Sequence, residues 1–127
     1  MFNGRKRDSA QAEATAEHRS RQDAAPRLCE QAPHVKTLRL TFNEQRASGP
    51  TSLSYAQPIV VATAPAYFEI RCMEPRCDGR HDLTAPIMRA LGQRLTSFTG
   101  ESACNGIVSN ALCDRTLIYV CEAAHRA

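Results

Sequence analysis

The chain has 127 residues and a formal net charge of +3, which fits one compact domain with tails and is far below the charge of a dedicated nucleic-acid domain. Alanines (19) and cysteines (6) supply much of the 43% hydrophobic fraction, so the core is expected to be thin and a cross-link or metal would help it fold. The sequence contains no long apolar run, and polar sequence rather than an apolar segment follows residues 1–8, so we expect a cytoplasmic protein with neither a membrane span nor a signal peptide.

The first part of the chain, residues 1–32, is predicted to be an N-terminal charged helical arm. Residues 8–25 are rich in Ala, Gln, Glu and Arg, and Glu17 and Arg21 are spaced to pair one helical turn apart. The segment has no apolar stripe, so the helix is expected to be solvated. Residues 33–127 are predicted to form the α+β domain that carries a metal site.

Residues 34–70 show the period of β-strands. Leu38, Leu40 and Phe42 alternate with polar residues and are expected to share one buried face. A loop is expected at Gly49–Ser52, and a strand at the β-branched run Ile59–Ala62. The alternation after Pro65 predicts Ala66, Phe68 and Ile70 inside and Tyr67, Glu69 and Arg71 outside.

A helix is predicted in the region that begins at Thr84. Ile87, Leu91 and Leu95 recur every four residues, and Thr84 is expected to be the N-cap. Strands are predicted at residues 97–103 and 115–122, and the second of these is apolar on both faces, as in a central strand. The predicted fold class is therefore α+β: a small antiparallel sheet with one packed helix, cysteine hairpins and the N-terminal solvated helix.

Four of the six cysteines form two local pairs. Four residues separate Cys72 from Cys77, eight separate Cys104 from Cys113, and turn-forming residues lie within or beside both intervals. Two turns that supply two thiolates each are a common way to give Zn²⁺ its four tetrahedral ligands. We therefore predict a zinc site at these four cysteines, with His81 as an alternate ligand that could replace one of them.

This arrangement of paired cysteines and strands resembles a zinc ribbon elaborated by one helix, over residues 67–124. The resemblance implies a bound metal but no particular task, because such domains contact nucleic acids, contact proteins or serve as structural staples. Two other interpretations stay open, namely a disulfide framework, which needs an oxidising compartment, and unligated thiols. Cys29 and Cys121 are interpreted as small apolar residues.

No convincing catalytic constellation is present, because a closed site of four thiolates leaves no position for water. Four arginines near the cysteines could form a phosphate-sized patch or a partner-binding rim, although nearby acidic residues could neutralise it; they are Arg71, Arg76, Arg80 and Arg115. We therefore predict a non-catalytic zinc-binding adaptor with a protein partner. The alternatives are a nucleic-acid-binding zinc ribbon and a thiol redox sensor.

Overall fold

The computed structural model describes residues 2–47, 52–74 and 76–127. Within these residues, three helices and a four-stranded antiparallel sheet combine with two small hairpins, which confirms the predicted α+β fold class. The helices are α1 (Phe2–Ala24), α2 (Leu28–Gln31) and α3 (Thr84–Gly92). The sheet has the strand order β2–β1–β8–β5, formed by β2 (Ser52–Ile59), β1 (Val35–Arg46), β8 (Arg115–His125) and β5 (Ser97–Ala103). The small hairpins are β3 (Glu69–Arg71) with β4 (Arg80–Asp82), and β6 (Ile107–Val108) with β7 (Ala111–Leu112).

The strand β8 lies in the middle of the sheet, as its two apolar faces predict. It pairs with β1 on one side and with β5 on the other, so that Cys121 lies opposite both Leu40 and Phe98. The long β1 also pairs with β2, which forms one edge of the sheet.

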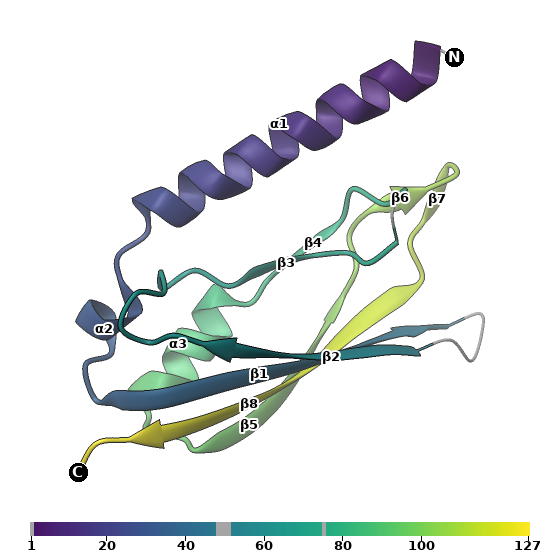
Figure 1. The fold of residues 1–127 in the computed structure, drawn as a ribbon. Helices are drawn as coiled ribbons and strands as arrows, with labels where there is room; N and C mark the ends of the chain where they lie inside the picture. The colour runs from purple at the N-terminus through teal and green to yellow at the C-terminus, as the bar shows by residue number, and fades with distance from the viewer. Residues whose placement is uncertain (1, 48–51, 75) are drawn as a thin grey trace.

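The core lies on one face of this sheet. The alternation of β1 is confirmed, because Leu38, Leu40 and Phe42 are all buried, and Leu117, Tyr119 and Cys121 of β8 are buried on the same face. Figure 1 shows α3 and the β3–β4 hairpin on the same side of the sheet, and α3 contributes Ile87 and Leu91 to the core. Burial of these side chains is the main force that holds the thin domain together.

The prediction of a strand at Ile59–Ala62 is wrong, because β2 ends at Ile59, where that strand was expected to begin. Residues 52–59 satisfy the ladder of β1, and Pro58 is tolerated there because β2 is an edge strand. The chain then turns at Val60, whose carbonyl accepts the N–H of Ala64 at 2.9 Å. The loop predicted at Gly49–Ser52 lies outside the described residues, except for Ser52, which begins β2.

Helix α3 confirms the predicted helix but not its ends. Leu83 rather than Thr84 occupies the N-cap position, and the Thr84 hydroxyl accepts the backbone N–H of Phe68 at 2.8 Å instead. The Asp82 carboxylate accepts the N–H of Thr84 at 3.1 Å and so satisfies one of the free donors of the first turn. The helix ends at Gly92, which leaves Leu95 outside it and 40% exposed.

Glu69 was expected to point outward, and this prediction is wrong. Its side chain is buried beneath the outermost helix, α1, where it accepts hydrogen bonds from Tyr67, Arg21 and Arg80 and contacts His18 Nδ1 at 3.5 Å. A buried carboxylate needs such partners, which the alternation pattern alone does not reveal.

Helix α1 lies on the outside of the molecule, above β3 and β4 (Figure 1). Most of its described side chains are exposed, and Glu17 pairs with Arg21 at 3.8 Å as its spacing predicts. Its described contacts with the rest of the chain are polar or aromatic, for example from Thr15 to Arg71 and from His18 to Tyr67.

The division of the chain after residue 32 stays a prediction. Leu28 of α2 and the following Ala32 are both buried in the same core as the sheet. In the described part of the chain, no helix combines the length and the apolar character that a membrane crossing requires.

Candidate metal centre

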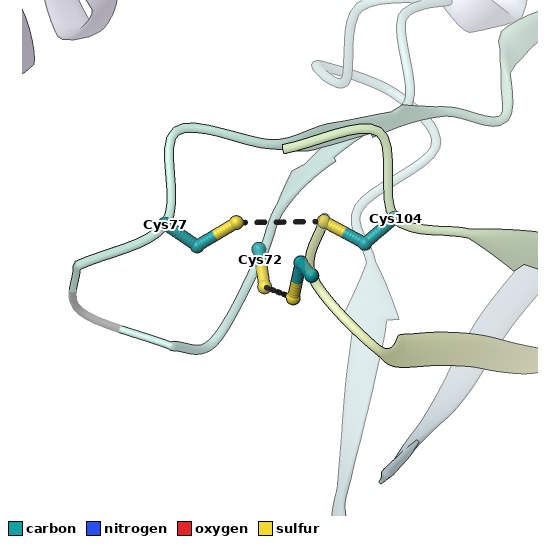
Figure 2. Close-up of side chains that lie close together, drawn as sticks. Cys72, Cys77 and Cys104 are labelled. Atoms are coloured by element: carbon teal, nitrogen blue, oxygen red, sulfur yellow. Dashed lines mark hydrogen bonds between the residues drawn. The ribbon is translucent and has the colours of Figure 1, made fainter. Parts of the chain in front are cut away.

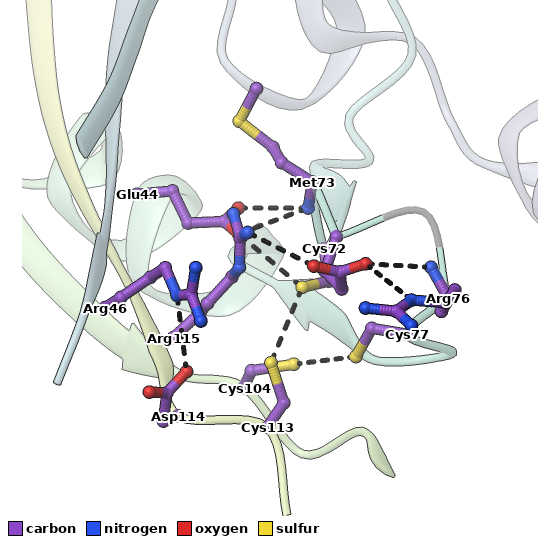
Figure 3. A network of polar contacts seen from close by, with 11 residues as sticks. Glu44, Arg46, Cys72, Met73, Arg76, Cys77, Cys104, Cys113, Asp114 and Arg115 are labelled. Atoms are coloured by element: carbon purple, nitrogen blue, oxygen red, sulfur yellow. Dashed lines mark hydrogen bonds and ion pairs between the residues drawn. The ribbon is translucent and has the colours of Figure 1, made fainter. Parts of the chain in front are cut away.

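The four paired cysteines gather at one point of the structure. Their sulfur atoms all lie within 4.8 Å of one another. Figure 2 shows the contact between the sulfur atoms of Cys77 and Cys104, which lie 3.5 Å apart, and Figure 3 shows the contact between those of Cys72 and Cys113, at 3.9 Å. Around a tetrahedral Zn²⁺ ion with bonds of about 2.3 Å, the sulfur atoms lie about 3.8 Å apart. The cluster therefore has a size that could hold one metal ion.

Two hairpins bring these residues together. Cys72 follows β3 directly, and Cys77 lies in the loop that returns to β4. Cys104 follows β5 directly, and its N–H donates to the Arg115 carbonyl at 2.9 Å, which extends the ladder between β5 and β8. Each cysteine is thus fixed to a strand end or to the short loop between two strands.

The backbone around the sulfur atoms repeats in the two hairpins. The N–H of Gly79 donates to Cys77 Sγ at 3.3 Å, and the N–H of Gly106 donates to Cys104 Sγ at 3.4 Å. The carbonyls of the same two glycines accept the N–H groups of Cys72 and Cys113, at 3.0 and 2.9 Å. Backbone N–H groups aimed at sulfur stabilise the thiolate form that a metal requires.

The two glycines also lie against each other. A Cβ atom on Gly79 would collide with Cys104 Sγ and lie 2.8 Å from the Gly106 nitrogen. A Cβ atom on Gly106 would collide with Cys77 Sγ and lie 2.7 Å from the Gly79 Cα. Both positions therefore require glycine for the close approach of the hairpins.

Burial opposes ionisation of the free thiols. It raises the pKa of Cys72 and of Cys104 well above the usual range of cysteine, and the nearby Glu44 carboxylate raises the pKa of Cys72 further. A cation placed among the sulfur atoms would favour the thiolates against this effect of burial, and metal binding would then release protons.

A buried ion pair supports the centre from the side of the main sheet (Figure 3). Glu44 of β1 is 1% exposed, and it accepts a hydrogen bond from Arg115 of β8 at 3.0 Å. Glu44 also accepts the N–H of Met73 and lies 3.5 Å from Cys72 Sγ. The other end of the Arg115 guanidinium donates to Glu74 at 3.3 Å. This network joins the first cysteine loop to the two central strands.

The arginines of the predicted patch are engaged with oxygen atoms of the chain. Arg76 pairs with Glu74 at 3.4 Å, and Arg80 pairs with the buried Glu69 at 3.2 Å. Arg71 donates to the Thr15 hydroxyl at 3.0 Å, and Arg115 is itself buried. The structure thus places all four near the cysteine loops, but with much of their charge balanced locally.

His81 is not among the residues whose ligand atoms gather. It lies in β4 rather than in a loop, is 1% exposed, and its Nδ1 lies 2.9 Å from the Ser102 hydroxyl. Burial lowers the pKa of His81, and among the described residues its Nε2 has no hydrogen-bond partner. The ring therefore packs between β4 and β5 as a neutral side chain.

The other two cysteines lie outside the cluster. Cys121 is fully buried in the core, and burial raises its pKa to about 12. Cys29 is half-buried in α2, with its thiol 3.7 Å from the Ala62 carbonyl.

The long interval between Cys104 and Cys113 forms the β6–β7 hairpin. Ser109 and Asn110 at its turn have positive φ angles of 51° and 65°, as in the tight turns that join neighbouring strands. Ile107 and Leu112 pair across the hairpin and are 55% and 77% exposed. This interval thus projects two large apolar side chains into solvent.

Sequence reasoning missed two features of the centre. The Cys-x-Gly pattern at Cys77 and again at Cys104 was visible in the sequence and marks both tight approaches. Glu44 continues the inward alternation of Leu38, Leu40 and Phe42, but its burial depends on Arg115, which is 71 residues away in the chain.

Comparison with known proteins adds no further support. No protein-family model, no curated protein and no solved structure matches the chain. What the structure shows is four close cysteines that could bind a metal, which is consistent with the zinc-ribbon resemblance.

Proposed function

We propose that the chain is a non-catalytic zinc-binding protein, in which one Zn²⁺ ion joins the two cysteine hairpins. The observation that carries the proposal is the convergence of Cys72, Cys77, Cys104 and Cys113 within 4.8 Å. Four thiolates form the donor set of many structural zinc sites, and a closed set leaves no coordination position for water or substrate. The opposed glycines and the N–H groups aimed at sulfur further support a metal–thiolate site.

The thin apolar core gives the metal a physical role. The β3–β4 and β6–β7 hairpins are only two or three residues long on each strand, and such hairpins are marginal without an additional constraint. A bound ion would supply that constraint, and its binding energy would count as folding energy. The proposal places the protein in a reducing, cytoplasmic setting, because the thiols must stay unoxidised.

For the biological role, we propose an adaptor that binds a protein partner. The exposed Ile107 and Leu112 support this role, because large apolar side chains that project into solvent suit contact with a protein surface. The local pairing of Arg76 with Glu74 and of Arg80 with Glu69 weakens the case for phosphate binding.

Metal analysis of the purified full chain tests the zinc proposal. We expect about one equivalent of Zn²⁺, and we expect a strong chelator to loosen the two hairpins as it removes the metal. Cys104→Ser is expected to lower the metal content, whereas Cys29→Ser serves as the matched control and should leave it unchanged. A reduced chain that binds no metal and shows the same hydrogen exchange with and without chelator would overturn the proposal.

A salt titration tests the choice of partner. Binding of RNA or DNA that weakens steeply with salt, with a smaller slope for Arg76→Ala, would support the alternative role in nucleic-acid binding. We expect no such binding at physiological salt.

A further inference from the structure

We propose that the same four cysteines also form a site of oxidation, at which a peroxide converts them into two disulfides that join hairpin to hairpin. The pairs are Cys77 with Cys104 and Cys72 with Cys113. The inference uses the cysteines of the proposed zinc site and rests on that function only for the state of the thiolates before oxidation.

The pairing follows from the described sulfur contacts, both of which cross from one hairpin to the other. Cys77 Sγ lies 3.5 Å from Cys104 Sγ, and Cys72 Sγ lies 3.9 Å from Cys113 Sγ. A disulfide has a bond length of about 2.05 Å, so each pair needs to close by less than about 2 Å. The backbones already meet at Gly79 and Gly106, where no Cβ atom holds the hairpins apart.

Exposure sets the order of the two reactions. Cys77 and Cys104 are buried, whereas Cys72 and Cys113 are both half-buried, so a small oxidant reaches the second pair first. We therefore expect the pair of Cys72 and Cys113 to form before the pair of Cys77 and Cys104.

Each disulfide consumes one peroxide molecule. The Cys113 thiolate attacks one oxygen of hydrogen peroxide, the O–O bond breaks, and a sulfenic acid and a hydroxide ion form. The Cys72 thiolate then attacks this sulfur, the S–O bond breaks, and a second hydroxide ion leaves as the disulfide forms. The two sulfur atoms lose two electrons in total, and the peroxide gains them. With two of its four thiolates consumed, the site releases the metal.

Oxidation in this pattern replaces one cross-link by another. The joined residues are 27 and 41 positions apart in the chain, so each disulfide closes a long loop and restricts the unfolded chain strongly. We therefore expect the oxidised protein to keep its hairpins together, whereas the reduced protein without metal loses this constraint.

Peptide mapping of the zinc-loaded full chain after treatment with hydrogen peroxide tests the pairing. Trypsin separates Cys72 from Cys77 by cutting after Arg76, and chymotrypsin separates Cys104 from Cys113 by cutting after Leu112. We expect the peptide of Cys72 linked to that of Cys113, and the peptide of Cys77 linked to that of Cys104. Cys29 and Cys121 should remain as thiols, and a colorimetric chelator should record zinc release as the first pair forms.

Matched variants keep the test independent of metal binding. Cys77→Ser/Cys104→Ser retains the expected pair of cysteines 72 and 113, and Cys72→Ser/Cys104→Ser retains the mismatched cysteines 77 and 113, so both variants keep the half-buried Cys113. In metal-free protein, we expect the first variant to form its disulfide about tenfold faster, because its sulfur atoms are already in contact. Hydrogen exchange of the reduced variants checks that both retain the sheet.

The outcomes separate the two proposals. Disulfides within a hairpin, or sulfinic acids without disulfides, would overturn this inference while the zinc content still supported the proposed function. Cross-hairpin disulfides in a chain that binds no zinc would uphold the inference and refute the proposed function.

Discussion

Gly79 and Gly106 face each other from the two cysteine hairpins. A Cβ atom on Gly79 would collide with Cys104 Sγ, and a Cβ atom on Gly106 would collide with Cys77 Sγ. We therefore expect Gly79→Ala or Gly106→Ala to lower zinc affinity and to destabilise the domain by about 1–3 kcal/mol through overpacking. Metal competition and urea unfolding measure the two effects. Gly92→Ala is the matched control, since nothing lies within 4 Å of its Cβ position at the end of α3. Equal metal affinity in all three variants would contradict the steric argument.

The buried pair of Glu44 and Arg115 is expected to be essential for stability. Arg115→Met leaves the Glu44 carboxylate buried without its cation and should cost about 3–5 kcal/mol in the free energy of unfolding. Glu44→Gln/Arg115→Met removes both charges and should recover part of this loss, which urea unfolding of the single and double variants can measure. A double variant no more stable than Arg115→Met would argue against the buried charge as the cause.

Glu69 gives the fold a dependence on acid pH. Burial alone would raise the pKa of Glu69, but the hydrogen bonds from Tyr67 and His18 and the charge of Arg80 outweigh burial and lower it. The resulting stability is fully present above the unfolded pKa of about 4.3 and is lost as the pH falls through the lower folded value. Urea midpoints between pH 7 and pH 3 should show the difference between wild type and Glu69→Gln shrinking toward low pH. A difference that stays constant with pH would contradict this role of Glu69.

His81 should add a second pH dependence, near neutrality. Burial lowers the pKa of His81 in the folded state, so below about pH 6.5 the unfolded chain takes up a proton that the folded chain does not. Stability should therefore fall as the pH falls from about 6.5 toward the folded pKa. His81→Phe removes this titration, and its stability relative to wild type should rise over the same interval. Parallel pH profiles for the two proteins would show that His81 is not the titrating group.

The features predicted from sequence are those that depend on local pattern. The period of two at Leu38, Leu40 and Phe42 and the period of four at Ile87 and Leu91 identified the buried faces of β1 and α3. The cysteine spacing identified the four residues that the structure brings together. Each of these signals lies within a few residues of chain.

The features that sequence reasoning missed depend on contacts between distant segments. Residues 59–62 have the composition of a strand, but β1 forms its backbone hydrogen bonds on that side with residues 52–59 instead. Glu69 alternates as an outward residue, yet Arg21 and Arg80 from other elements make its burial tolerable. Such long-range partners cannot be located from a single sequence.

The way α1 is attached has a consequence for the behaviour of the chain in different buffers. Its described contacts include the ion pair between Glu69 and Arg21, whose side chain is 54% exposed, and dissolved salt weakens the attraction of an exposed charge but not the burial of the core. High salt is therefore expected to release α1 from the domain while the sheet stays folded. The N-terminal helix would then pack against the domain in dilute buffer and extend away from it in concentrated salt.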